Sequence, residues 1–166
     1  MWNNEDLAKK EWRQVTDVYD IQSQWRLLIL TAFYLGGVGC GLFVMGWWTG
    51  FWPALVASLI IVGVGKSVAH LLYLGKPSRF PKAFLRPQTS WLSRGLIGVV
   101  VFVVSGLLYT GPLVPGFGWL PWSASSSLGV VFGLVAVASA VFVMLYSGFL
   151  MADVKAIPFW NTPLLP

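Results

Sequence analysis

The chain alternates between long apolar runs and short polar segments. Four of the runs reach membrane-spanning length, at residues 25–48, 51–74, 92–110 and 128–151. An α-helix needs about 20 predominantly apolar residues to cross the hydrocarbon core of a bilayer. The pattern therefore predicts an all-α integral membrane protein, with four antiparallel transmembrane helices in a bundle over residues 25–151.

Polar residues gather in three places outside these runs. Residues 1–24 form a polar start, in which apolar residues at helical spacing are compatible with a short amphipathic helix on the membrane surface. Residues 75–91 form a basic loop interrupted by prolines, and residues 152–166 form a tail that begins polar and turns apolar. We expect these three segments to lie on the same side of the membrane, since four spans separate the first from the last.

Composition and charge agree with this topology. The chain is 57% hydrophobic and only 10% charged, whereas soluble domains carry about 25% charged residues. The turn at residues 49–50 and the connection at 111–127 carry no charge, so every charged residue lies on one side or in the adjoining halves of the spans. The excess of Lys and Arg predicts a multi-pass protein of the inner (cytoplasmic) membrane, with its charged loops in the cytoplasm.

The chemistry available to the chain is narrow. It has one cysteine, Cys40, and one histidine, His70. These are too few for an iron–sulfur cluster, a zinc site or a haem with two histidine ligands. Any electron chemistry based on metals must therefore come from a partner chain. The basic residues flank membrane spans, which favours topology and partner contacts over nucleic-acid binding.

Two pairs of glycines have the spacing that lets membrane helices approach closely. Gly37 and Gly41 form one GxxxG pair, and Gly129 and Gly133 form another. We expect both pairs to pack against neighbouring helices. A ring-shaped ligand against the glycines of the first span is the alternative.

Three motifs resemble the NrfD/PsrC/DmsC family, the quinone-reactive membrane subunits of polysulfide, dimethyl sulfoxide and related molybdopterin oxidoreductases. They are LGKPSRFPKAFLRPQTSWLSRG at 74–95, YLGGVGCG at 34–41 and AIPFWNTPLLP at 156–166. Family members are usually longer, and this chain resembles their N-terminal half, the half that holds the quinone. On this resemblance, the tail at 152–166 would lead into a fifth helix.

The resemblance implies a membrane-anchor subunit that is not catalytic alone. It would exchange electrons between a quinone pool, menaquinone or ubiquinone, and an iron–sulfur partner subunit, and through that partner a catalytic subunit. The chain itself would bind neither haem nor an iron–sulfur cluster. The alternative is an anchor and interaction subunit without its own quinone site. A proton-coupled transporter is disfavoured because the first three spans contain no Asp or Glu.

Three residues are the main candidates for quinone contact. His70 has an imidazole, whose unperturbed pKa of about 6.5 suits proton exchange near neutral pH, so it is our candidate catalytic residue. Lys66, one helical turn earlier, would support a quinol anion or pair with Asp153. Tyr146 would donate to the second quinone carbonyl. The structural alternatives are a histidine bonded to a loop carbonyl, a lysine that snorkels to the headgroups, and a tyrosine at the membrane interface.

Further candidates lie on the charged side. Trp25 and Arg26 open the first span, and we include them in the quinone site, although such residues more often serve as an aromatic belt and a headgroup anchor. A separate set of basic residues is expected to dock the partner subunit: Lys76, Arg79, Lys82, Arg86 and Arg94. Binding of anionic lipid is the alternative role for these charges.

Overall fold

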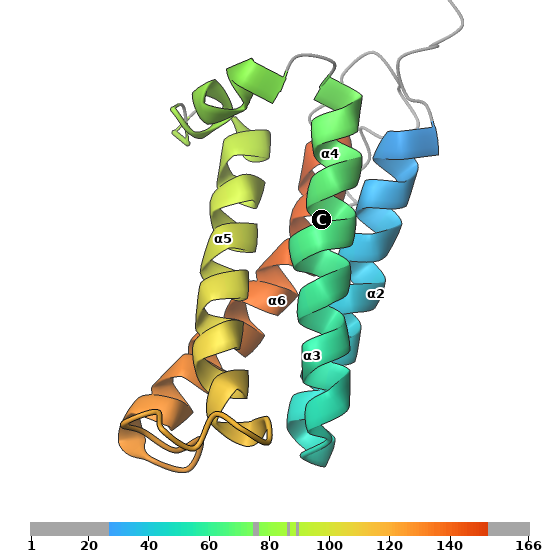
Figure 1. Ribbon diagram of the computed structural model, residues 1–166. Helices are drawn as coiled ribbons and strands as arrows, with labels where there is room; N and C mark the ends of the chain where they lie inside the picture. Colours follow the sequence, from blue (N-terminus) through green and yellow to red (C-terminus); the bar gives the residue numbers. More distant parts are fainter. Residues whose placement is uncertain (1–26, 75–76, 86, 89, 153–166) are drawn as a thin grey trace, which may run out of the picture.

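The computed structural model describes residues 27–74, 77–85, 87–88 and 90–152 of the chain. The predicted N-terminal segment at 1–24 and the tail beyond residue 152 lie outside the described residues. The described elements are all helices (Figure 1): α2 Leu27–Thr49, α3 Trp52–Ile60, η1 Ile61–Lys66, α4 Ser67–Leu74, η2 Pro77–Phe84, α5 Trp91–Thr110, η3 Gly111–Leu113 and α6 Ser127–Ala152.

Four helical stretches are long and apolar enough to cross a membrane. They are Leu27–Thr49, Trp52–Leu72, Trp91–Leu113 and Ser127–Leu150. This confirms the prediction of an all-α membrane protein with four transmembrane helices. The observed bounds lie close to the predicted ones, because a run of apolar residues of bilayer length is visible directly in the sequence.

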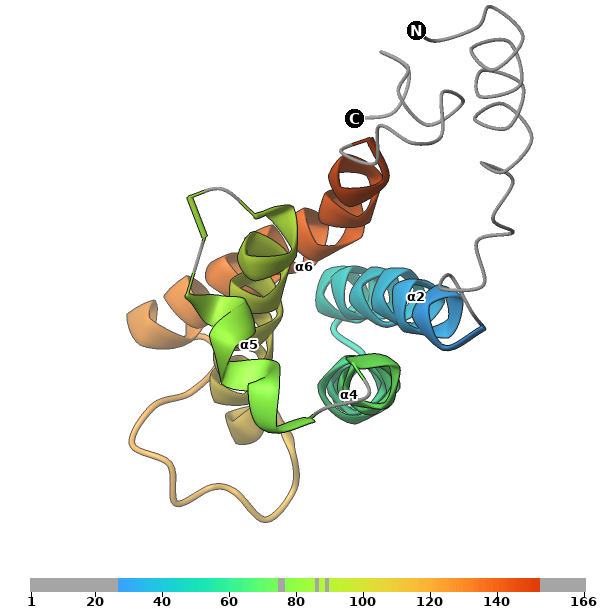
Figure 2. The same ribbon diagram turned by 90° about the horizontal axis from the view of Figure 1, so that it is seen from above.

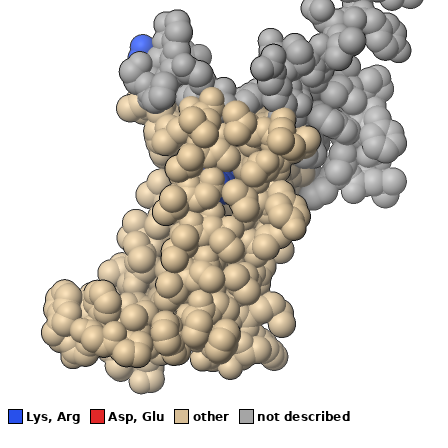
Figure 3. Space-filling view, turned by 45° about the vertical axis from the view of Figure 1, so that its right-hand side comes forward, with Lys and Arg blue, Asp and Glu red and all other residues tan. Residues whose placement is uncertain are grey.

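Successive spans run in opposite directions and pack as a bundle (Figures 1 and 2). Helix α5 packs along α6, while α2 contacts both α6 and the second span. We call the end that holds the start of α2 and the start of α5 the charged end, and the opposite end the uncharged end. Among the described residues, the side chains of Lys66, Lys82 and Arg94 all belong to the half nearer the charged end. Figure 3 shows one face of the molecule, on which the lower part carries neither blue nor red.

The turn between the first two spans is short. Gly50 has φ of +69°, a left-handed conformation that favours glycine. The amide of Phe51 then donates to the carbonyl of Gly46 at 3.0 Å. Pro53 lies in the first turn of α3, where its missing N–H leaves no helical hydrogen bond unmade.

The second span is not a regular α-helix. Between α3 and α4 the backbone forms the π-helix η1, which ends at Lys66. A π-helical turn widens the backbone and changes the direction of the residues that follow, and such turns are frequent at functional sites. Here it accompanies a lysine that lies inside the bundle.

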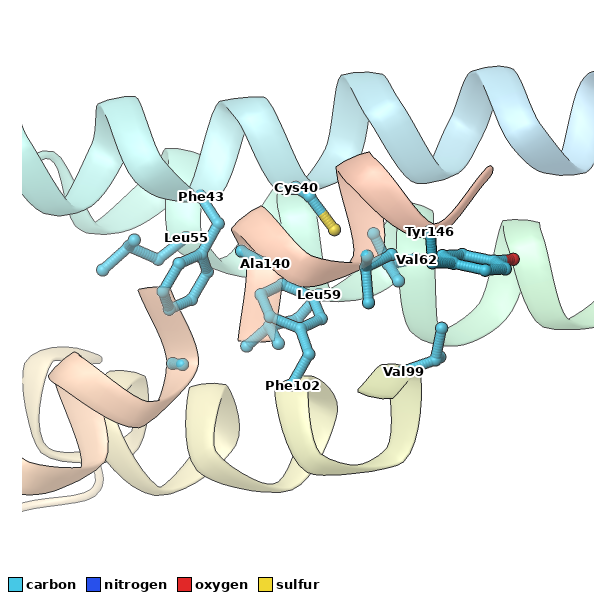
Figure 4. Close-up of a cluster of buried hydrophobic side chains, with 11 residues drawn as sticks. Cys40, Phe43, Leu55, Leu59, Val62, Val99, Phe102, Ala140 and Tyr146 are labelled. Carbon is cyan, nitrogen blue, oxygen red and sulfur yellow. The ribbon is translucent and has the colours of Figure 1, made fainter. Parts of the chain in front are cut away.

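The apolar core lies between the helices (Figure 4). The rings of Phe43 and Phe102 meet edge to face, with 5.1 Å between centroids. Ser58 donates to the carbonyl of Gly39 at 2.6 Å, which joins the second span to the first. Tyr146 belongs to the same core, and its hydroxyl lies at the edge of the cluster in Figure 4.

The predicted contact of the first glycine pair is not made within the described residues. A Cβ placed on Gly37 or Gly41 would meet nothing within 4 Å, whereas one on Gly39 would lie 2.5 Å from Val62 Cγ2. The close helix contact is therefore made on the Gly39 face of α2. GxxxG spacing identifies small residues but not which way the helix faces.

The second glycine pair behaves differently at its two positions. Gly133 contacts another helix, since a Cβ there would lie 3.0 Å from the ring of Tyr109. Gly129 instead packs against the backbone of the preceding loop, at Ser123 and Ala124. Only Gly133 thus makes the predicted contact with a neighbouring helix.

The basic loop folds over the charged end. Its 3₁₀-helix η2 contacts both α4 and α5, at the top of the view in Figure 1. Phe80 and Phe84 pair edge to face with 5.4 Å between ring centroids. Ser93 at the start of α5 donates to the carbonyl of Ala83 at 2.6 Å, so the loop is tied to the bundle.

Candidate functional site

Lys66 is buried inside the bundle, with 3% of its surface exposed. Its Nζ donates to the carbonyl oxygen of Ala32 at 3.2 Å and to the hydroxyl oxygen of Tyr146 at 3.0 Å. Lys66 therefore does not snorkel to the headgroups. Tyr146 is 2% exposed, so it is a core residue and not an interfacial aromatic.

The surroundings of the Lys66 amine are neutral. Nζ lies 5.6 Å from the ring centroid of Phe33 and 5.2 Å from that of Tyr146, close enough for cation–π attraction. No Asp or Glu is present in the part of the chain that the structure describes, and Asp153, the predicted acidic partner, lies outside it. A buried ammonium is costly unless compensated. Within the described residues the compensation consists of hydrogen bonds and aromatic faces alone.

Two glycines make room for this pair of side chains. A Cβ on Gly36 would lie 2.9 Å from Lys66 Nζ, and a Cβ on Gly95 would overlap the ring of Tyr146. The sequence predictions missed both positions. Gly36 stands inside a glycine cluster and Gly95 ends the family motif, but neither spacing reveals which side chain fills the space.

His70 is also buried, with 5% of its surface exposed. Its Nδ1 has no hydrogen-bond partner among the described residues. The imidazole meets the ring of Phe33 edge to face, with 6.2 Å between centroids, and Phe33 meets Tyr146 in the same way at 6.4 Å.

The structure thus brings Lys66, His70 and Tyr146 together around Phe33, and we call these four residues the polar cluster. Helix α2 contributes Phe33, the second span contributes Lys66 and His70, and α6 contributes Tyr146. The phenol accepts a hydrogen bond from the amine, so its own O–H remains available to donate. The cluster offers an ammonium, a phenol and an imidazole nitrogen within an otherwise apolar interior.

The other candidate residues are not part of this cluster as far as they are described. Trp25, Arg26, Lys76 and Arg86 lie outside the described residues. Arg79 and Lys82 belong to η2, where Lys82 is exposed. Arg94 lies in the first turn of α5, and its guanidinium donates to the carbonyls of Pro87 and Gln88, each at 2.7 Å.

An apolar groove of about 740 Å³ lies between the second span and α5. It begins near Trp52 at the uncharged end and reaches Gly63 and Val64 in η1. None of the polar cluster lines it. The groove is lined almost wholly by apolar side chains. The polar cluster is therefore the candidate site, because its buried side chains offer hydrogen-bonding and basic groups.

The fold and the polar cluster define a class: a multi-pass membrane protein whose helical bundle encloses hydrogen-bonding and basic groups. The profile of the DMSO reductase anchor subunit (DmsC) family matches residues 51–166, which is more than half of the chain. The chain therefore belongs to the family of DMSO reductase anchor subunits, as the sequence motifs predicted. The match includes the second span and α6, and hence Lys66, His70 and Tyr146.

One curated relative is a sulfite dehydrogenase subunit of Allochromatium vinosum, which is 28% identical over 118 residues. The alignment covers 67% of this chain and 35% of the relative. The chain thus spans about a third of the length of that relative. No solved structure matches the chain significantly.

Proposed function

We propose that the chain exchanges electrons between a membrane quinone pool and an iron–sulfur partner subunit, as the membrane anchor of a multi-subunit oxidoreductase. Membership of the anchor-subunit family supports the anchoring role, and the name of the sulfite dehydrogenase relative supports an oxidoreductase complex. The observation that carries the quinone assignment is the buried amine of Lys66, whose described partners are all uncharged.

The polar cluster fits the needs of a quinone head group. A quinone carbonyl requires hydrogen-bond donors, and its oxygen gains negative charge on reduction. Lys66 and Tyr146 provide donors, and the unpartnered Nδ1 of His70 provides a titratable nitrogen. When bound, a quinone would supply two-electron, two-proton redox chemistry, and menaquinone and ubiquinone both have it.

Each residue of the cluster would have a separate task. The Lys66 ammonium would stabilise negative charge on an oxygen, an effect that is strong where water is excluded. Tyr146 would orient the head group through its O–H, since its oxygen already accepts from Lys66. His70 would hold or release the proton, because an imidazole can take up and give up a proton at its ring nitrogens.

The groove between the second span and α5 offers space for the apolar part of a quinone. A quinone also needs space for its tail, and pockets of about 300–1,000 Å³ are typical of small-molecule sites. The groove falls in this range at about 740 Å³. It reaches Gly63 and Val64 in η1, the element that ends at Lys66, while the polar cluster itself lies outside its lining.

The docking proposal concerns the basic loop at the charged end. Charge reversal of Arg79, Lys82 and Arg86 to Glu should weaken association with the iron–sulfur partner by at least about tenfold, because like charges juxtaposed across an interface cost several kcal/mol. Copurification across a salt gradient measures this. The matched control exchanges the same positions between Lys and Arg, which keeps the charge. A complex that survives the reversal in detergent and high salt contradicts the docking role.

We also propose that the charged end faces the cytoplasm, in the inner membrane. Lys82 is exposed, whereas the native Cys40 is fully buried, so Lys82→Cys adds one accessible thiol. That thiol should react with a membrane-impermeant maleimide only after the cells are opened. Labelling of this thiol in intact cells would show that the charged end faces the outside instead.

A further inference from the structure

A second groove lies on the outer face of the α5–α6 pair, with a volume of about 470 Å³. Its lining combines small residues, namely Gly98, Ala138 and Ser139, with larger ones, namely Ile97, Val101 and Phe142. Ile97 and Val101 are 38% and 40% exposed, so the groove opens outward, away from the bundle interior. In a membrane protein this face meets lipid or another membrane helix.

Arg94 stands at the charged-end limit of this groove. From Arg94 to Val101 the groove extends about 10 Å along α5, at about 1.5 Å per residue. The small side chains of Ala138 and Ser139 leave space along the outer face of the two helices. Gly98 already packs so closely that a Cβ there would lie 2.6 Å from the ring of Phe142. The groove therefore lies where α5 and α6 pack closely against each other.

The guanidinium of Arg94 is held in place but keeps donors to spare. Its Nε and Nη2 donate to the carbonyls of Pro87 and Gln88, each at 2.7 Å, and its Cζ lies 4.6 Å from the ring centroid of Trp91. The Trp91 ring is stacked on Phe149, with 4.7 Å between centroids and 7° between planes. Two of the five guanidinium N–H groups are thus engaged with described residues. All of these partners are neutral, so the positive charge remains uncompensated by them.

We propose that this groove binds one anionic phospholipid, with its phosphate on Arg94 and an acyl chain along the apolar part of the groove. Arginine is well suited to phosphate because its planar fork can form paired hydrogen bonds. The position also suits a lipid, since Arg94 lies in the first turn of a transmembrane helix and the apolar groove extends from it towards the membrane centre. The proposal gives Arg94 a lipid role in place of the partner-docking role that the sequence suggested, and it does not depend on quinone binding.

The test uses the full-length chain in detergent, with native mass spectrometry of bound lipid. Dioleoyl phosphatidylglycerol should remain bound at concentrations where dioleoyl phosphatidylcholine does not. Arg94→Gln should weaken phosphatidylglycerol binding about tenfold, as expected for loss of a charge-assisted contact worth about 1.5 kcal/mol. Lys82→Gln, which removes an exposed charge from the same end, is the matched control and should leave binding unchanged.

Ala138→Leu provides a second test that leaves the contacts of Arg94 intact. Its larger side chain occupies part of the groove that Ala138 lines, so it should also reduce phosphatidylglycerol binding. Soluble glycerol 3-phosphate should fail to compete at lipid concentrations, because the acyl chain contributes to binding. Equal binding of the two lipids, or unchanged binding by both variants, overturns the proposal. Loss of the iron–sulfur partner from Arg94→Gln with unchanged lipid binding would assign Arg94 to docking instead.

Discussion

Substitution of His70 by alanine is expected to lower quinone-linked turnover about a hundredfold, within the range of about 10²–10⁴ for a positioned acid–base group. The imidazole is buried beside Phe33 and its Nδ1 has no hydrogen-bond partner among the described residues. Its removal therefore breaks no described hydrogen bond of Nδ1, and the bundle should still assemble with its partners. Turnover of the catalytic subunit with an artificial dye should stay intact.

The measurement compares quinone-linked and dye-linked rates in the assembled complex. Ser58→Ala is a suitable control, since Ser58 is another buried polar residue of the second span and bonds the Gly39 carbonyl. It should cost stability without changing the ratio of the two rates. Full quinone-linked activity in His70→Ala would make the histidine structural and favour the alternative of an anchor without its own quinone site.

The transmembrane helices could be predicted from the sequence because their signal is local. The predicted runs 92–110 and 128–151 differ from α5 Trp91–Thr110 and α6 Ser127–Ala152 by at most one residue at each end. Apolar length decides whether a segment spans a bilayer, and neighbouring helices change this little. Proline at the start of a helix is a local signal as well, which is why Pro53 could be placed in the first turn of the second span.

The direction that each helix faces could not be predicted in the same way. Spacing put Lys66 and His70 on one face, but it did not distinguish a lysine that reaches the headgroups from one that reaches Tyr146, 80 positions later in the chain. The π-helix η1 adds to this difficulty, since its residues carry no distinctive pattern. For the same reason, the spacing of the glycines did not predict that Gly39, and not Gly37, contacts the second span. Such outcomes depend on how four helices pack together, which no single span encodes.

The polar cluster also differs from the rest of the interior in its energetic character. Core residues such as Phe43 and Phe102 gain stability from close packing. Lys66 instead places an amine among neutral groups, and the room for it is made by glycine at position 36. Proteins commonly give up stability at functional sites in this way. A lysine kept for function should therefore be replaceable, together with the hydroxyl group that it bonds, with a gain in stability and a loss of activity.

This contrast yields the second prediction, for Lys66→Met and for Lys66→Met combined with Tyr146→Phe. The single change should lower quinone-linked turnover by about a hundredfold, as removal of one donor to a developing negative charge typically does. It also leaves the Tyr146 hydroxyl without its described partner, which costs about 1 kcal/mol. The double variant removes both polar groups, and its free energy of unfolding should exceed that of the natural chain by about 1–2 kcal/mol.

Denaturant unfolding in detergent micelles and quinone-linked assays on the assembled complex measure the two effects. A double variant that is less stable and fails to bind its partners would show that Lys66 holds the bundle together, and the functional assignment of the amine would then be wrong.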